Sequence, residues 1–217
     1  MMSYSINLEI IESAYVYAPQ EIEELNTKIL VPKMLTRRRL TRAAKIAIYL
    51  SDKVLFKKGR IVYGSSFGEL LSTSQILHSI GEQETISPTH FQNSVYNTAV
   101  SYLSMLHDNQ EEIMTISSGD NTSLSVLKVA AVKALEGDTI LLLVTETLNI
   151  DNIEKVNKCA AHLECGVALK VRLTNEKATL DLNALKSEDK MPNSINKMFT
   201  IAKNCDRDKT NIIEVLL

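Results

Sequence analysis

The sequence of 217 residues has few aromatic side chains. Tryptophan is absent and aromatic residues make up only 5% of the chain, which argues against the aromatic platforms that stack on single-stranded nucleic acid. The formal net charge is −2, so the chain as a whole has no electrostatic attraction to nucleic acid or to an anionic membrane. We therefore expect neither nucleic acid nor a membrane among its partners.

Long apolar segments are also missing. No run reaches the roughly 18 consecutive apolar residues that a membrane-spanning helix needs. The N-terminus, MMSYSINLEIIESAY, lacks the basic segment followed by an apolar stretch that marks a secretory signal. At 45% apolar residues, the composition is typical of a globular protein with a core. These features predict a cytoplasmic protein.

Cysteine is scarce. Cys159, Cys165 and Cys205 are an odd number without the spacing of metal ligands, and we interpret them as reduced packing residues. The stretch YGSSFGEL contains glycines, but it lacks the lysine of a phosphate-binding loop and the G-x-G-x-x-G pattern. The sequence therefore indicates no metal site and only a weak nucleotide signal.

Repeats, low-complexity tracts and Pro/Gly/Ser linkers are absent, so residues 1–217 are expected to form one domain. Apolar periodicity predicts alternating strands and helices, hence an α/β fold. The expected strands are residues 6–16, 61–64 and 140–144, with a late hairpin made of residues 167–173 and 178–182. Residues 184–217 are polar and mixed, and their pattern predicts no element.

Three helices are expected before residue 110. The first begins at Thr36 and places on one face Leu40, Ala43, Ala44, Ala47 and Ile48. The second follows a capping box of Ser66 and Glu69, ends at Gly81, and has a buried side formed by Leu70, Leu77 and Ile80. The third starts at Ser87 and Pro88 and repeats apolar side chains at Phe91, Val95, Ala99, Tyr102 and Leu106.

The segment that follows Thr122 is apolar around nearly its whole circumference. Between residues 124 and 135 only Lys128 and Lys133 are charged. A helix that is apolar all round is expected to be buried all round. The next apolar run, residues 140–144, is typical of a strand covered on both faces. Together they predict a layered fold with this helix enclosed between sheets.

The turn Ser117 to Thr122 joins a strand to that helix, which is a place where enzymes put nucleophiles and bind anions. A serine there is one interpretation, but the turn lacks the Gly-x-Ser-x-Gly elbow, and none of the four histidines lies in a motif. The other interpretation is that Asp120, Asn121 or Thr122 caps the helix. The residues leave both open, and capping is favoured.

The basic stretch RRRLTRAAK is a second candidate site. Arg38, Arg42 and Lys45 are expected to share one helical face. Such a face is either a solvated stripe or a docking surface for an acidic partner. Nucleic acid is disfavoured as that partner because the total charge is close to neutral.

Three segments together resemble a known family: VYGSSFGELLSTSQILHSI, ISPTHFQNSVYNTAVSYLSM, and ISSGDNTSLSVLKVAAVKALEGDTILLLVTET. They are similar to the N-terminal half of β-ketoacyl synthases, and more closely to the chain-length-factor-like subunits of bacterial aryl-polyene and related type II polyketide clusters. Most of the match lies in Ser87, Pro88, Thr89, Phe91, Val95, Asn97, Ala99, Leu103 and Ser104. The matching core covers about residues 60–150.

The resemblance implies the thiolase-like layered αβαβα fold, with only its N-terminal half in this chain. In active members the turn before the central helix carries a cysteine that takes the acyl chain, and that position corresponds here to Asp120. Active members also use histidines, or histidine and lysine, from the C-terminal half. A carboxylate is a poor thioester acceptor, so the resemblance implies no catalytic residue at Asp120.

The resemblance further implies a non-catalytic partner of a ketosynthase, in a heterodimer that elongates chains delivered by an acyl carrier protein without any cofactor. The alternatives are a stand-alone thiolase-fold enzyme acting on acyl thioesters through Ser117, Ser118 or Asp120, and an acyl or carrier-protein binding module. The implied chain tunnel and subunit interface comprise Tyr96, Asn97, Val100, Ser101, Ser104, Glu112, Ile113, Met114, Thr115 and Ile116, with Arg38, Arg42 and Lys45 as possible carrier-protein docking residues.

Overall fold

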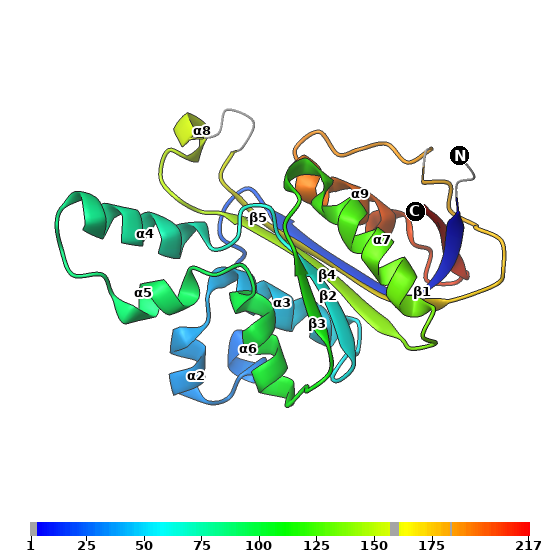
Figure 1. Cartoon of the computed structure of the whole chain (residues 1–217), viewed down its shortest axis with the longest axis horizontal. Coiled ribbons are helices and arrows are strands. Elements are labelled where there is room, and N and C mark those ends of the chain that lie inside the picture. Colours follow the sequence, from blue (N-terminus) through cyan, green and yellow to red (C-terminus); the bar gives the residue numbers. More distant parts are fainter. Residues whose placement is uncertain (1–3, 157–160, 183) are drawn as a thin grey trace.

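The structure is a computed structural model that describes residues 4–156, 161–182 and 184–217, and its centre is one mixed sheet (Figure 1). The strand order is β3-β2-β4-β5-β1-β6. The strands are β1 (Ser5–Ala18), β2 (Arg60–Gly64), β3 (Ile113–Ile116), β4 (Ile140–Leu148), β5 (Leu163–Leu173) and β6 (Asn211–Leu216). β2 is parallel to both β3 and β4, whereas β5 is antiparallel to β4 and β1, and β1 is antiparallel to β6.

Helices cover both faces of the sheet. α3 (Arg42–Lys53) and α6 (Thr98–His107) pack together on one face, and α7 (Thr122–Ala134) and α9 (Asn193–Asn204) pack together on the other. The remaining helical segments are α1 (Thr27–Leu30), α2 (Met34–Arg39), α4 (Leu70–Gly81), α5 (Pro88–Asn93), α8 (Ile153–Val156) and the 3-10 turn η1 (Gly119–Asn121). The described residues thus form a helix–sheet–helix sandwich, from which α4 and α5 extend (Figure 1).

The strand β4 is buried along its whole length. Leu141 and Leu143 belong to the core under α3 and α6, while Leu142 and Val144 belong to the core under α7 and α9. Successive side chains of a strand point to opposite faces, so one strand contributes to both cores. The prediction of a strand covered on both faces is confirmed.

Two glycines let helices approach the sheet closely, one on each face. A Cβ at Gly64 would lie 2.7 Å from Cγ2 of Val126 in α7, and a Cβ at Gly166 would lie 2.5 Å from Cγ2 of Ile46 in α3. Both separations are far below van der Waals contact. Any larger residue at either position would push a helix away from the sheet.

The helix expected from Thr36 is two helices. α2 ends at Arg39, Leu40 is extended, and α3 begins after Thr41, whose side chain accepts a hydrogen bond from the backbone N–H of Ala44 at 3.1 Å. The apolar face that follows Leu40 is buried as expected. Arg38 and Arg42 therefore lie on different helices, and the prediction that they share a face with Lys45 is wrong.

The next two helices also differ from expectation. Ser66 and Glu69 form no capping box, because the backbone N–H of Ser66 bonds to Glu146 and the Glu69 carboxylate accepts from Thr41. The helix expected from Ser87 breaks after Asn93, so that α5 and α6 are separate. On α4 the side expected to be buried is open, because Leu77 and Ile80 are exposed.

Two further predictions about the second half need correction. Residues 178–182 form no hairpin with β5. Instead Thr179 and Leu180 donate backbone hydrogen bonds to the carbonyl of Ile212 in β6, while β5 lies between β4 and β1. Residues 184–217, for which the pattern predicted nothing, supply α9 and β6.

The apolar helix after Thr122 is α7, and it is not enclosed within this chain. Val126, Ala130 and Ala134 on its inner side are fully buried, but Leu124 and Val132 on its outer side are exposed. The prediction of complete burial is wrong for the described residues, because a single sheet and α9 cover only part of its circumference. The chain supplies three successive layers, helix, sheet and helix, and α7 lies in one of the two helical layers.

The cysteines that the structure describes form no disulfide. Cys165 is buried in β5 and Cys205 is half-buried after α9, and both are free thiols. Burial raises the pKa of both thiols, which lowers their reactivity and agrees with a packing role. Cys159 lies outside the described residues.

Candidate functional site

The carboxyl ends of the parallel strands β2, β3 and β4 lie at one end of the sheet. The chain leaves β2 toward α6 on one face and leaves β3 toward α7 on the other. In open α/β sheets, ligands bind in the crevice where neighbouring connections turn to opposite faces. This switch point contains the turn Ser117 to Thr122 and the loop Ser65 to Gly68, and we treat it as the candidate site.

The turn between β3 and α7 is held by Thr122. Its hydroxyl donates to the carbonyl of Gly119 at 2.7 Å and accepts from the backbone N–H of Ser118 at 3.0 Å. Gly119 has a φ of +55°, which glycine adopts without strain. The capping interpretation is wrong for all three candidates: Asn121 is in the N-cap position but makes no side-chain cap bond, Asp120 makes none, and the Thr122 hydroxyl bonds the turn before the helix.

Asp120 is exposed at the tip of this turn. Its Oδ2 accepts a hydrogen bond from Nδ2 of Asn193, at 3.3 Å, from the start of α9. Ser117 and Ser118 are exposed as well, and their hydroxyl groups have no hydrogen-bonding base among the described residues. A serine without a base is a weak nucleophile, and among the described residues neither serine is hydrogen-bonded to one.

The deepest polar group of the crevice is Glu146, near the end of β4. It is completely buried, and its carboxylate accepts from the hydroxyl of Ser65 at 3.0 Å and from the backbone N–H groups of Ser66 and Phe67 at 2.7 and 3.2 Å. Burial raises the pKa of Glu146, and the hydrogen bonds from this loop oppose that shift. The loop donors that could hold a bound anion are therefore occupied by a carboxylate of the same chain.

A second buried carboxylate, Glu69, precedes α4. Its Oε1 accepts a hydrogen bond of 2.7 Å from the hydroxyl of Thr41, the capping residue of α3. Burial raises the pKa of Glu69 to about 7, against the opposing effect of the Thr41 hydrogen bond. The charge of this residue thus changes near neutral pH.

The third buried carboxylate explains the position of Arg42. Glu164 in β5 is 1% exposed and accepts two bonds from Arg42, at 2.8 Å from Nε and at 2.5 Å from Nη2, and one from the backbone N–H of Ile22. Arg42 also forms an ion pair with Glu21. Arg42 is therefore committed to internal contacts, in contrast to the solvated position that the sequence suggested.

Glu146 and Glu164 were missed by the sequence analysis, which assigned Glu69 only to a capping box, although a signal was present. Glu146 and Glu164 are single charges within otherwise apolar strand segments, LLLVTETL and LECGVAL. A charge in such a segment is expected to be paired or hydrogen-bonded, because an uncompensated buried charge costs several kcal/mol. The partners themselves, 79 to 142 residues away in the sequence, could not be read from the pattern.

The expected tunnel residues do not share one surface. Val100 is buried in the core under α3, while Tyr96 and Asn97 are exposed and Ser101 and Ser104 are half-buried. Tyr96 contacts the loop of the crevice: its ring carbons lie about 3.2 Å from the position of a Cβ on Gly68, and its hydroxyl donates to the carbonyl of Ser66 at 3.3 Å.

The strand β3, which contains Ile113 to Ile116, is an edge of the sheet and pairs only with β2 among the described strands. Its outer hydrogen-bonding groups are therefore available, as the sequence predicted. Glu112, just before it, forms an ion pair with Lys133 of α7 at 2.9 Å. This contact ties the start of the edge strand to the helix on its face.

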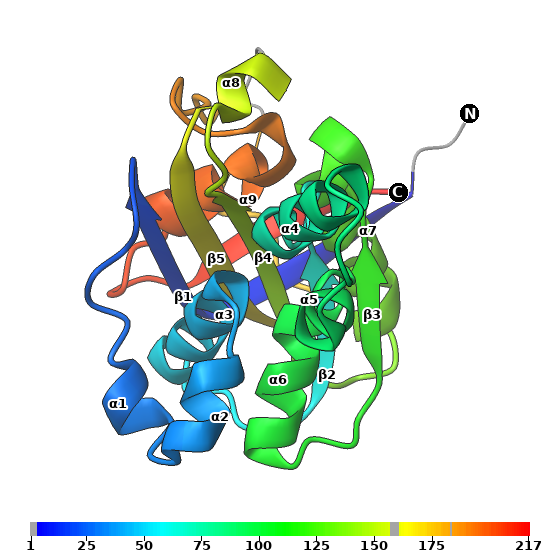
Figure 2. The ribbon, with the colours of Figure 1, turned by 90° about the vertical axis from the view of Figure 1, so that its left-hand side faces the viewer.

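An arm of two helices, α4 and α5, which connects β2 to α6, projects away from the sandwich (Figures 1 and 2). Large apolar side chains lie open on it, with Leu77 63% and Phe91 68% exposed. Other exposed apolar residues of the same segment are Leu71, Ile80, Ile86 and Val95. Contiguous exposed apolar surface marks interaction sites in folded proteins.

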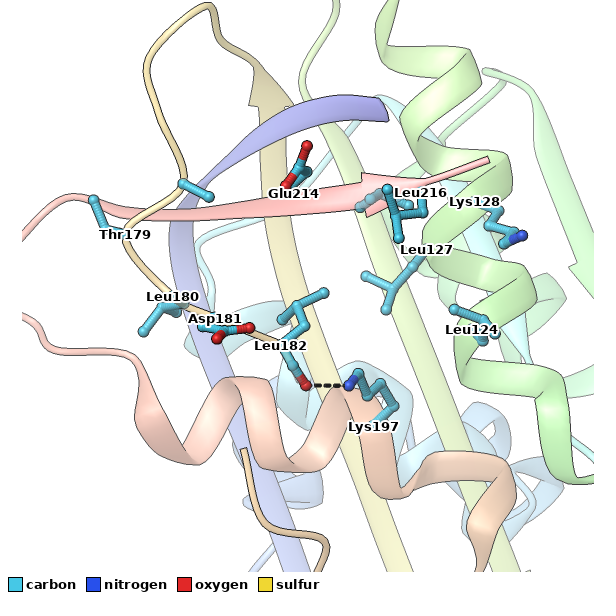
Figure 3. Close-up of a pocket in the computed structure, with 12 residues that line it drawn as sticks. Leu124, Leu127, Lys128, Thr179, Leu180, Asp181, Leu182, Lys197, Glu214 and Leu216 are labelled. Atoms are coloured by element: carbon cyan, nitrogen blue, oxygen red, sulfur yellow. Dashed lines mark hydrogen bonds between the residues drawn. The ribbon is translucent and has the colours of Figure 1, made fainter. Parts of the chain in front are cut away.

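A cavity of about 440 Å³ lies between α7, α9 and β6 (Figure 3). Its walls include Leu124 and Leu127 of α7 and Leu216 of β6, and Lys197 of α9 donates from Nζ to the carbonyl of Leu182 at its floor. The lining is mostly apolar and continues the open side of α7. This face is therefore incompletely covered by the described part of the chain.

The described residues are 4–156, 161–182 and 184–217. Within these ranges no three His, Cys, Asp or Glu side chains cluster as metal ligands would. No helix in the same ranges is long and apolar enough to cross a membrane.

The comparison with protein families establishes what class of protein this is. The family model for the β-ketoacyl synthase N-terminal domain matches residues 13–217, and the chain therefore belongs to this family. The match reaches well beyond the core of about 60–150 expected from the sequence. No curated protein matches the chain.

Solved structures share the fold. A chain of the ketosynthase ApeO in complex with its chain length factor ApeC, from Xenorhabdus doucetiae, is 21% identical with a TM-score of 0.70, and the alignment covers 92% of this chain and 93% of that one. The ishigamide ketosynthase/chain length factor is 14% identical with a TM-score of 0.61, and the alignment covers 80% of this chain and 63% of that one. AntDE:AntF, a type II polyketide acyl carrier protein in complex with its ketosynthase, is 12% identical with a TM-score of 0.50. The alignment covers 78% of this chain and 59% of that one.

The chain thus spans most of the first matched chain but less than two thirds of the other two. At these identities the similarity establishes the fold alone. The α/β architecture is that of the thiolase-like ketosynthases, and the three layers of this chain account for part of the five-layered arrangement expected from the sequence.

We predict a pH dependence that originates at Glu69. Because its pKa rises from 4.5 to about 7 on folding, the folded state binds the proton more tightly, and stability is lost as pH rises through that interval. The loss is on the order of 3 kcal/mol. Glu69→Gln keeps an acceptor for Thr41 and should remove this loss, as measured by urea unfolding between pH 4.5 and 8. The exposed Glu82→Gln is the control, and equal pH profiles for Glu69→Gln and the parent chain would contradict the prediction.

Proposed function

We propose that this chain is a non-catalytic, chain-length-factor-like subunit that pairs with a ketosynthase in acyl-carrier-protein-dependent polyene or polyketide elongation. The observation that carries the proposal is the open edge of β3 together with the exposed apolar arm of α4 and α5. An unpaired edge is a template for another strand, and the apolar surface of the arm extends the contact area. A ketosynthase partner would supply the reactive cysteine and histidines.

The turn at the family's nucleophile position supports a non-catalytic role. Asp120 stands where active relatives carry cysteine, and its carboxylate is hydrogen-bonded to Asn193. A carboxylate cannot replace a thiolate in acyl transfer from a thioester near neutral pH. The carboxylate of Glu146 also occupies the donors of the neighbouring loop. We therefore assign the condensation chemistry, which needs no cofactor, to the partner subunit.

The similarity to the ApeO–ApeC complex supports a ketosynthase partner, because ApeO and ApeC are a ketosynthase and its chain length factor, and the chain similar to this one has nearly its length. The aryl-polyene class rests on the sequence resemblance. On this proposal the acyl carrier protein delivers chains to the heterodimer in the cytoplasm. Of the proposed docking cations, Arg42 is bound to Glu164, which leaves Arg38 and Lys45.

Two other functions are distinguished by simple assays. A stand-alone thiolase-fold enzyme would turn over acyl thioesters as a purified chain, and that activity would disappear on substitution of Ser117, Ser118 or Asp120. A binding module for acyl chains or carrier proteins would bind them without any ketosynthase. Turnover by the chain alone would overturn the non-catalytic assignment.

The test of pairing uses the edge strand. N–H groups alternate along a strand, and the bonds from Ile61 to Glu112 and from Ser65 to Ile116 place the N–H of Thr115 on the open side. Thr115→Pro should therefore abolish co-purification with the co-expressed ketosynthase and leave the β2 pairing intact. Thr115→Val, which keeps this N–H, should co-purify normally.

Expressed without the ketosynthase, the chain should form aggregates or a weak homodimer, because its apolar arm and open edge stay uncovered. Size exclusion with light scattering measures this. A stable, well-folded monomer, or a Thr115→Pro variant that still binds the ketosynthase, would count against the proposal.

Asp120→Asn should leave chain elongation by the assembled complex largely intact. The amide oxygen still accepts from Asn193, and the expected change in rate is below about tenfold. Product formation by the purified complex is measured with carrier-bound substrates. A loss of more than about a hundredfold, about 2.7 kcal/mol of barrier, in a complex that still assembles would identify Asp120 as a catalytic group.

The product length should depend on Tyr96 and not on Val100. Tyr96 lies against the Ser66 to Gly68 loop beside the edge strand, so Tyr96→Ala should lengthen the product by one or more two-carbon units, each added methylene gaining about 0.8 kcal/mol on burial. Val100→Phe overpacks the core, with a cost of about 1–3 kcal/mol, and should leave the lengths unchanged. Mass spectrometry of carrier-bound products measures the product lengths of both variants. Unchanged lengths with Tyr96→Ala and shorter products with Val100→Phe would place Val100, and not Tyr96, in the tunnel.

A further inference from the structure

A groove of about 630 Å³ lies between α2 and α6, away from the candidate site. α2 and α6 lie side by side, with α5 at one end of them (Figures 1 and 2). Leu35 of α2 and Met105 of α6 line the groove and are 72% and 66% exposed, and Tyr102 and Leu106 are half-buried beneath them. Large apolar side chains from two helices thus face solvent together.

The charges of this groove have one sign. The residues that line it include Lys33 and Arg39 and no carboxylate. Neither cation has a hydrogen-bonding or ion-pair partner in the described part of the chain, whereas Arg42 and Arg60 are both paired with glutamates. The chain as a whole carries a net charge of −2, so the positive character belongs to this surface and not to the protein in general.

The neighbouring arginine has a different role. Nη1 of Arg37 donates to the carbonyls of Val31 and Pro32, at 2.8 and 2.6 Å. These bonds fix the connection between α1 and α2, and with it the wall of the groove. Cations near a helix C-terminus are favoured by the dipole, but that effect does not explain apolar side chains exposed beside them.

We propose that this groove binds an amphipathic helix of a partner protein, with apolar side chains seated between α2 and α6 and acidic side chains toward Lys33 and Arg39. An apolar centre with a charged rim is the usual composition of such contacts, and a helix laid in a groove is a common recognition mode. The acidic character of the occupant follows from the charge of the rim. The inference does not depend on pairing with a ketosynthase through β3.

The binding test uses a fluorescein-labelled peptide of fourteen residues that has leucines at helical spacing and glutamates on its other face. Two control peptides have the glutamates replaced by lysines or the same residues in scrambled order. Fluorescence anisotropy is measured with the full chain in the soluble form in which it purifies. The acidic helix should bind at least tenfold more tightly than either control, and higher salt should weaken that binding.

Two variants test the location. The double substitution Lys33→Glu with Arg39→Glu should weaken binding of the acidic peptide at least tenfold. The double substitution Leu35→Ser with Met105→Ser should also weaken binding of the acidic peptide, by a factor that changes little with salt concentration. The matched control is Lys177→Glu with Lys186→Glu, which changes two exposed lysines of the segment that leads to α9 and should bind normally. Circular dichroism checks that each variant is folded.

Three results would overturn the proposal: no binding of the acidic peptide below about 1 mM, equal binding of the acidic and lysine peptides, or equal loss with the Lys177/Lys186 control. A photoreactive leucine analogue in the peptide gives an independent measurement. Cross-links should map to α2 and α6, and cross-links confined to the α4–α5 arm or to α7 would also reject the groove as the binding site.

Discussion

The buried carboxylate of Glu146 constrains much of the structure around the crevice. A carboxylate removed from water costs several kcal/mol unless hydrogen bonds compensate it, and here the hydroxyl of Ser65 and two backbone N–H groups do so. These bonds hold the loop after β2 in one conformation. Tyr96 packs on that loop, so the entrance to α6 depends on the same interaction. The crevice that binds ligands in related folds is thus organised around a buried carboxyl group of the chain itself.

The sheet and the helices differ in how completely they are covered. Every residue of β4 is buried, and Gly64 and Gly166 allow a helix to reach the sheet on each face. The outer sides of α4, α5 and α7, in contrast, keep large apolar residues in solvent. Burial of one sheet on both faces is sufficient for a folded core. The remaining apolar side chains contribute to stability only when another protein removes them from water. The proposed ketosynthase contact and the groove between α2 and α6 are separate parts of this uncovered surface.

The candidate site shows which contacts local sequence motifs could not predict. The turn before α7 could be located from the sequence, but only the structure showed that Thr122 holds this turn through Ser118 and Gly119 and that no side chain caps the helix. Arg42 was read from the sequence as part of a basic face that is either solvated or a docking surface, but Glu164 binds it from a strand 122 residues away in the sequence. Long-range pairs of this kind have no local pattern, because neither partner changes the periodicity of its own element.

The sequence by itself determined the elements whose pattern is local and strong. The apolar runs of β2 and β4 and the apolar inner side of α7 were readable because burial imposes a period on consecutive residues. The interface position of Ile113 to Ile116 was implied only by the resemblance to the family. Only the tertiary structure decided that α2 and α3 are separate, that residues 178–182 lie along β6, and that α9 completes the second helical layer. It also decided that the apolar circumference of α7 exceeds what this chain covers, because the number of layers packed around a helix depends on distant segments and on partners, and not on the helix itself.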